Sequence, residues 1–139
     1  MTSVLRALSL SSVLRAQLDR EARAAHPREC CGLIEGVRDG DVVNATALHP
    51  TRNLATEPDR FEIDPAAHFA LMRGLRGTAS EIVGCYHSHP EGTAQPSQRD
   101  HEGSSEEGFV WLIAATRNGA SELRAFVREG GGFRALMLA

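Results

Sequence analysis

The chain has 139 residues, enough for one domain with a substantial core, and hydrophobic residues make up 42% of it, which excludes wholesale disorder. The formal net charge of −3 excludes the basic character that is typical of proteins binding nucleic acid or anionic lipid. We therefore expect a single domain over residues 1–139.

The cysteines indicate a reducing compartment. Cys30, Cys31 and Cys85 are odd in number and two of them are adjacent, so they form no disulfide framework. Free thiols favour a cytoplasmic protein. Residues 1–16 contain arginine and no acidic residue, a weak likeness to a transit peptide, but they lack a long apolar segment and we expect no cleavage. No stretch approaches the roughly 20 apolar residues of a membrane span.

The N-terminal quarter predicts a strand and then a helix. Residues 4–10 alternate enough to form a short strand. Ser11 or Ser12 can cap a helix that runs to about residue 25, where Pro27 ends it. Its apolar residues at helical spacing are Val13, Leu14, Leu18 and Ala22.

A hairpin and a second helix come next. Residues 30–37 and 42–49 predict two strands joined by a turn, and the polar residues 50–60 predict a loop. The sequence Arg-Phe-Glu-Ile-Asp that ends at Asp64 predicts a short strand. Asp64 and Pro65 have the residue types of a helix cap and first helical position, so we expect a helix from there to about residue 75.

The second half is rich in strands. A short helix should begin at Ser97 and run to about residue 106. The expected strands are 81–89, 109–116, 121–129 and 132–139. The order of elements predicts an α/β fold with a central, mixed and mostly antiparallel curved β-sheet, flanked by two longer helices and one short helix.

The sequence His-Ser-His-Pro at 87–90 contains two candidate metal ligands. Residues i and i+2 of a strand face the same side, so His87 and His89 should project together. Two imidazoles can supply two of the three protein ligands of a catalytic zinc. Asp100, with ten residues between it and His89, is a plausible third ligand. Taken alone, the pair is a weak signal that favours two solvent-facing or capping histidines over a metal site.

Further residues make the pattern specific. Glu29 precedes Cys31-Gly32 at the start of an apolar strand, and Pro96-Ser97 precedes Asp100 at the spacing P-S-x-x-D. Together with residues 87–90, this pattern resembles the JAMM/MPN-plus zinc metalloprotease family. The resemblance covers nearly the whole chain and implies a JAMM/MPN-like domain.

The resemblance implies a role for each residue of the pattern. It implies that His87, His89 and Asp100 bind Zn²⁺, that Glu29 is the general base for a zinc-activated water, and that Ser97 donates a hydrogen bond to the oxyanion. Simpler interpretations stay open: Glu29 as a charged residue at a strand entrance, and Ser97 with Asp100 as a helix capping box. We expect capping and ligation by Asp100 to exclude each other.

Bacterial relatives of this compact type resemble hydrolases that act on ubiquitin-like sulfur-carrier proteins of the ThiS/MoaD type. The resemblance thus implies a peptidase or isopeptidase that cuts the bond after the carrier's C-terminal Gly-Gly. The stretches at about 50–60 and 102–108 are short, which argues against a selective ubiquitin-chain protease. We expect the loop 50–60 to offer an edge to an extended substrate tail, with the Asn53 side-chain amide binding the substrate.

Two other functions are considered. One is a zinc hydrolase of another small peptide or amide, such as a cell-wall peptide or a siderophore-type intermediate. The other is a metal-free MPN scaffold that only mediates assembly, which the presence of every zinc ligand disfavours.

Overall fold

The structure is a computed structural model that describes residues 4–139 and places seven strands in one closed barrel, ordered β1-β3-β2-β4-β5-β6-β7. The strands are β1 (Ala7–Ser9), β2 (Cys31–Asp39), β3 (Val42–Thr51), β4 (Glu81–Pro90), β5 (Val110–Arg117), β6 (Ala120–Glu129) and β7 (Gly132–Leu138). The helices are α1 (Ser12–Ala25), α2 (Pro65–Leu75) and α3 (Gln98–Gly103). Residues 1–3 of the segment considered as a presequence lie outside the described residues.

The closed barrel corrects the expected open curved sheet. The three residues of β1 pair in parallel with β3 on one side and with β7 on the other, and so join the two edges of the sheet. The prediction of a mixed, mostly antiparallel sheet holds, because four of the pairings among the described strands are antiparallel and three are parallel. Closure satisfies backbone groups that an edge strand would leave unpaired.

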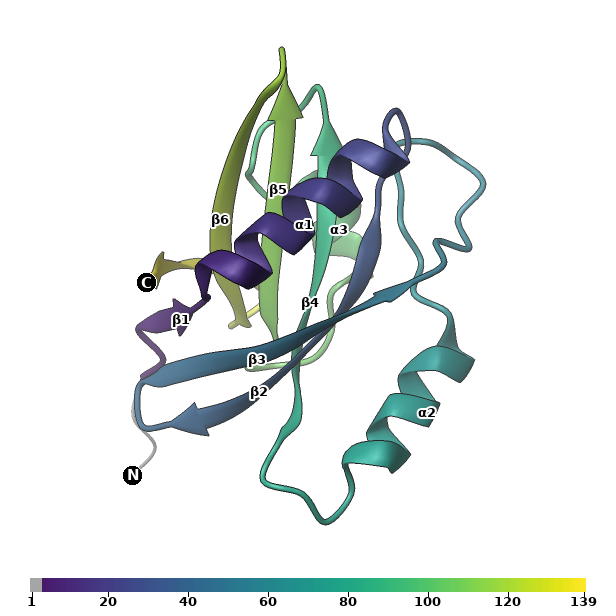
Figure 1. Cartoon of the computed structure of the whole chain (residues 1–139). Helices are drawn as coiled ribbons and strands as arrows, with labels where there is room; N and C mark the ends of the chain where they lie inside the picture. The colour runs from purple at the N-terminus through teal and green to yellow at the C-terminus, as the bar shows by residue number, and fades with distance from the viewer. Residues whose placement is uncertain (1–3) are drawn as a thin grey trace.

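Helix α1 begins where its cap was predicted. The Ser11 side chain accepts a hydrogen bond from the Leu14 N–H, and Leu18 and Ala22 are fully buried. Val13, which has helical spacing with them, is instead 72% exposed. The helix crosses one face of the sheet and contacts β3, β4 and β5 (Figure 1). Within residues 4–139, no helix combines the length and apolar character needed to cross a membrane.

Helix α2 also begins as predicted, with Asp64 accepting from the Ala66 N–H and Pro65 in the first turn. The expected strand before it is wrong: only an isolated bridge between Asn53 and Ile63 forms there. Helix α3 is shorter than predicted and ends at Gly103, because glycine followed by serines has low helix propensity.

The core has two parts, one on each side of the sheet. Along β5, Val110, Leu112 and Ala114 face the α1 side, and Trp111 and Ile113 face the other, as the alternation of a strand requires. The second side also holds Phe61, Cys85 and Phe126. The three cysteines are free thiols, as predicted.

The pairing of β2 with β4 determines where the predicted site residues meet. Cys31 lies opposite His87 in this antiparallel pair. Continued by two residues, the same register brings Glu29 opposite His89, and the Ser88 N–H still donates to the Cys30 carbonyl at 3.1 Å. Residues nearly 60 positions apart in the chain are therefore neighbours by backbone geometry.

We predict that Gly84→Ala is strongly destabilising. A Cβ at residue 84 would lie 2.0 Å from the Val110 carbonyl oxygen, so β4 and β5 would have to separate. We expect a loss of at least about 2 kcal/mol in the free energy of unfolding, measured by urea denaturation. The matched control is Gly74→Ala on α2, where an added Cβ meets nothing within 4 Å. Because alanine favours a helix more than glycine does, this variant should raise the free energy of unfolding by up to about 1 kcal/mol. A wild-type midpoint for Gly84→Ala would contradict the close strand approach.

Candidate metal centre

His87 and His89 project from the same face of β4 and their rings converge. The two Nε2 atoms are 3.0 Å apart. The Asp100 carboxylate meets both, with Oδ1 at 3.1 Å from His87 Nε2 and Oδ2 at 3.2 Å from His89 Nε2. All three residues are buried, and His87 is wholly inaccessible. The structure thus brings together the three residues predicted as ligands.

Asp100 also caps α3. Its Oδ2 accepts from the Ser97 N–H at 2.8 Å, while its own N–H donates to Ser97 Oγ at 3.1 Å, which completes a capping box. We expected capping and ligation to exclude each other. In the structure one carboxylate caps the helix and also meets both imidazoles: Oδ2 accepts from the Ser97 N–H and lies against His89, while Oδ1 lies against His87.

The cluster fits a small divalent cation. Bonds of 2.0–2.1 Å in a tetrahedral zinc site place ligand atoms about 3.3–3.4 Å apart, close to the separations of 3.0–3.2 Å among these atoms. His89 Nδ1 lies 2.7 Å from the Thr93 carbonyl, which only accepts, so Nδ1 carries the hydrogen. That tautomer leaves the Nε2 lone pair directed at the cluster.

The electrostatics of the cluster also call for a cation. Burial alone would raise the pKa of Asp100, but His87 and His89, which donate to it when their Nε2 atoms are protonated, hold that pKa well below its usual range. Burial lowers the pKa of His87, against the pull of Asp100. Burial also opposes charge on His89, yet Asp100 and the Thr93 carbonyl raise its pKa overall. A proton or a metal ion has to balance the buried carboxylate.

Glu29 lies beside the histidines without a partner of its own. It is 7% exposed, and its Oε1 is buried with no hydrogen-bond partner among the described residues. Burial raises its pKa to about 7, partly opposed by His89. Such a carboxyl group can take up and release a proton near neutral pH.

Two ligand sets share the histidine pair. One ligand atom each of Glu29, His87 and His89 lie within 4.8 Å of one another, which is also a geometry that could hold a metal. Asp100 is the better third ligand, because it contacts both imidazoles at hydrogen-bond distance and its carboxylate stays ionised. Glu29 then remains at the side of the site.

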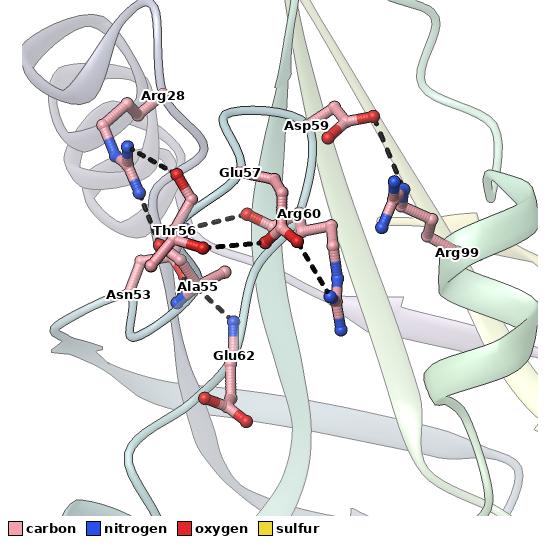
Figure 2. Close-up of polar contacts among 9 residues, drawn as sticks. All are labelled: Arg28, Asn53, Ala55, Thr56, Glu57, Asp59, Arg60, Glu62 and Arg99. Atoms are coloured by element: carbon pink, nitrogen blue, oxygen red, sulfur yellow. Dashed lines mark hydrogen bonds and ion pairs between the residues drawn. The ribbon is translucent and has the colours of Figure 1, made fainter.

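Two clefts reach the cluster. One, of about 600 Å³, is lined by Glu29, His89 and Ser97. The other, of about 580 Å³, is lined by Asp100 together with Phe61, Cys85 and Trp111. Asp59 and Arg99 line both clefts and form an ion pair at 3.4 Å between the loop 53–62 and α3 (Figure 2). Ser97 accepts from the Asp100 N–H, which leaves its hydroxyl proton to be donated elsewhere.

Two aromatic residues that sequence reasoning missed build the wall behind the cluster. Phe61 stacks on His87 with ring centroids 4.2 Å apart, and the Trp111 ring meets His87 edge-on at 5.6 Å. Phe61 lies in the segment 60–64, which was expected to be a strand. The alternation of apolar and polar residues in that segment gives no sign that Phe61 contacts the site. Only the position of Trp111 in an apolar strand could have suggested a role in the core.

The Asn53 amide, predicted to bind substrate, is engaged by main-chain groups in the structure. Its Nδ2 donates to the Glu29 carbonyl at 3.0 Å and to the Arg60 carbonyl at 2.9 Å. Its Oδ1 accepts from the N–H groups of Ala55 and Glu62, each at 2.9 Å (Figure 2). An amide has two donor hydrogens and two acceptor lone pairs, and these four contacts use all of them. Asn53 is also absent from the lining of both clefts.

The family is decided by a match over residues 11–129 to the family described as prokaryotic homologs of the JAB domain. The chain belongs to this family. The match includes every residue of the predicted pattern, and it confirms the JAMM/MPN-plus resemblance and the peptidase or isopeptidase class that the resemblance implies.

Individual relatives agree with this membership. The chain is 34% identical to a desampylase of Haloferax volcanii over 95% of each chain. It is 31% identical to a "Probable TtuB-protein conjugate cleaving protease" of Thermus thermophilus, over 89% of this chain and 75% of that protein. Among solved structures, the protein DSY2949 of Desulfitobacterium hafniense is similar with a TM-score of 0.86 and 26% identity, over 95% of this chain and 91% of that one.

We predict that the zinc content of variants separates the two ligand sets. Asp100→Ala, like His87→Ala and His89→Ala, should lose the one zinc expected per chain, because it removes one of three protein ligands. Glu29→Gln should keep it. Elemental analysis of the purified variants measures this directly. Full zinc in Asp100→Ala, or its loss in Glu29→Gln, would favour the set that contains Glu29.

Proposed function

We propose that this JAB-family chain is a zinc-dependent peptidase or isopeptidase of the cytoplasm. Its substrate is a ubiquitin-like sulfur-carrier protein of the ThiS/MoaD type, cut at the bond after the C-terminal Gly-Gly. The observation that carries the proposal is the convergence of His87, His89 and Asp100 at 3.0–3.2 Å beside the unpartnered carboxylate of Glu29. A scaffold would have no need for a buried cluster of this kind.

His87, His89 and Asp100 would hold the zinc ion through two Nε2 atoms and one carboxylate. When bound, zinc makes water acidic enough to attack at neutral pH and polarises the scissile carbonyl. Glu29 takes a proton from the attacking water and delivers it to the nitrogen of the leaving amine. The carbon–nitrogen bond breaks, and the products are the carrier's terminal carboxylate and a free amine. A pKa of about 7 suits a group that first accepts and then donates.

Ser97 is the proposed oxyanion donor. It lines the same cleft as Glu29 and His89, and the capping box fixes its position. Because its oxygen accepts from the Asp100 N–H, the hydroxyl proton can be donated to the oxygen that becomes negative in the transition state. The helix cap thus also orients a catalytic group.

Two features support a protein tail as the substrate. The named relatives are a desampylase and a protease that cleaves TtuB–protein conjugates. The clefts on either side of the Asp59–Arg99 pair are open and lie between the loop 53–62 and α3, so an extended chain can reach the cluster from the surface. A tail with small residues is favoured because the cluster itself is buried.

We predict that Glu29→Gln lowers kcat by roughly 10²–10⁴-fold while zinc is retained, because glutamine keeps the shape of glutamate but accepts no proton. Cleavage of a carrier fused through Gly-Gly to a short peptide, followed by intact mass, measures it. Turnover near the wild-type rate would remove Glu29 from the mechanism.

We predict that changing the substrate's Gly-Gly to Ala-Ala lowers kcat/KM at least about tenfold, or around 1.4 kcal/mol of transition-state binding. The added methyl groups keep the tail's backbone from approaching the buried cluster. The same fusion with Ala-Ala placed four residues upstream is the control. Equal turnover of both tails would instead favour the alternative of a zinc hydrolase for another small peptide or amide.

A further inference from the structure

The peptide group between Glu29 and Cys30 is held at both of its polar atoms by side chains. Its carbonyl oxygen accepts from Asn53 Nδ2 at 3.0 Å, and its N–H donates to Ser88 Oγ at 2.8 Å. The two side chains come from different places: Asn53 follows β3, and Ser88 lies on β4 between the two histidines. The peptide group is therefore fixed between the loop 53–62 and the histidine strand.

Regular strand pairing does not hold this peptide group. Strand β2 begins at Cys31, one residue later, and the last bond toward β4 runs from the Ser88 N–H to the Cys30 carbonyl. Where the backbone ladder stops, two side chains satisfy the remaining donor and acceptor. Ser88 is fully buried, so water does not compete with it for the Cys30 N–H.

The carboxylate of Glu29 depends on this arrangement. Its buried Oε1 has no partner among residues 4–139, so that oxygen is not held by a bond of its own. The direction of the side chain then follows from the backbone, and the plane of the peptide after Glu29 sets the backbone rotation at its Cα. Fixing that plane fixes the direction of the Cα–Cβ bond from which the buried side chain extends toward the histidines.

Asn53 connects the same plane to the loop beside the clefts. Its second donor hydrogen binds the Arg60 carbonyl, and its oxygen receives the Ala55 and Glu62 N–H groups (Figure 2). Arg28 adds a tie, donating to the Ala55 carbonyl at 2.5 Å and to the Thr56 carbonyl at 3.4 Å. The loop and the residue pair Arg28-Glu29 are thus interlocked from both sides.

We propose that Asn53 and Ser88 are positioning residues that together clamp the Glu29–Cys30 peptide plane and so aim the Glu29 carboxylate at the histidine pair. The catalytic consequence rests on the proposed function. The clamp itself is a property of the fold and can be measured without substrate.

The first test is kinetic and uses the zinc-loaded full chain with the Gly-Gly fusion. Asn53→Asp keeps the acceptor oxygen for Ala55 and Glu62 but removes the donor to Glu29, and Ser88→Ala removes the acceptor for Cys30. Both should keep zinc and lower kcat about 10–100-fold, with KM changed less than about threefold, because misaimed groups slow the reaction without weakening binding. Ser88→Thr, which keeps the hydroxyl, should recover most of the rate.

The double variant and a matched control sharpen this test. Since one peptide plane is held at two ends, the fold-decrease in kcat of the double variant Asn53→Asp/Ser88→Ala should be smaller than the product of the fold-decreases of the two single variants. Thr46→Val removes a side-chain donor to the carbonyl of Glu35 on β2, away from the cluster, and should leave kcat unchanged. Wild-type kcat in both single variants, or loss of zinc from them, would overturn the proposal.

The second test needs no activity. Hydrogen exchange of the Cys30 amide, followed by NMR, should be at least about tenfold faster in Asn53→Asp, although Asn53 does not touch that N–H, because release of one end loosens the whole plane. Unchanged exchange would overturn the clamp whatever the kinetics. If the wild type cuts no carrier fusion, the proposed function fails, and faster Cys30 exchange in Asn53→Asp would still support the clamp.

Discussion

The site depends above all on the antiparallel pairing of β2 with β4. This pairing puts Cys31 opposite His87. Because of this register, residues 29–30, which precede β2, lie alongside both histidines. The main-chain hydrogen bond from the Ser88 N–H to the Cys30 carbonyl extends this register and places Glu29 beside the histidine pair. A one-residue slip would turn the histidines to the other side of the sheet, because side chains alternate along a strand. The glycine at residue 84, packed against the Val110 carbonyl, fixes the other side of β4 equally closely.

Much of this could be predicted from local sequence. Asp64-Pro65 and Ser11 specify helix starts by residue type, and the structure places caps at both. The alternation His-x-His on an apolar strand and the spacing to Asp100 placed three residues in one cluster, which the structure forms. These signals involve residues close in sequence, or a pattern whose spacing is itself diagnostic.

The remaining features depend on contacts that no local pattern contains. Barrel closure requires the three-residue β1 to meet β7 at the far end of the chain. Phe61 sits in a segment that looks like a strand but bends to stack on His87. Asn53 has the composition of a substrate-binding loop residue, yet its amide is consumed by four main-chain partners. Asp100 contacts a helix cap and the histidine pair together, because its Oδ2 lies between the Ser97 N–H and His89, which sequence spacing does not show.

Under the proposed function, the double contact of Asp100 would link the architecture of the clefts to the zinc ion. Helix α3 has only six residues, too few to persist on its own in water, and its first turn is held by the Asp100 capping box. Anything that binds the folded cluster and not the unfolded chain stabilises the helix by mass action, and an ordered helix in turn raises the affinity of the ion. Arg99, which borders both clefts, stands on this helix. Removal of the proposed zinc ion by a chelating agent would therefore also destabilise α3, and the cleft walls beside it would lose order. The metal would then govern the shape of the entrance as well as the chemistry within it.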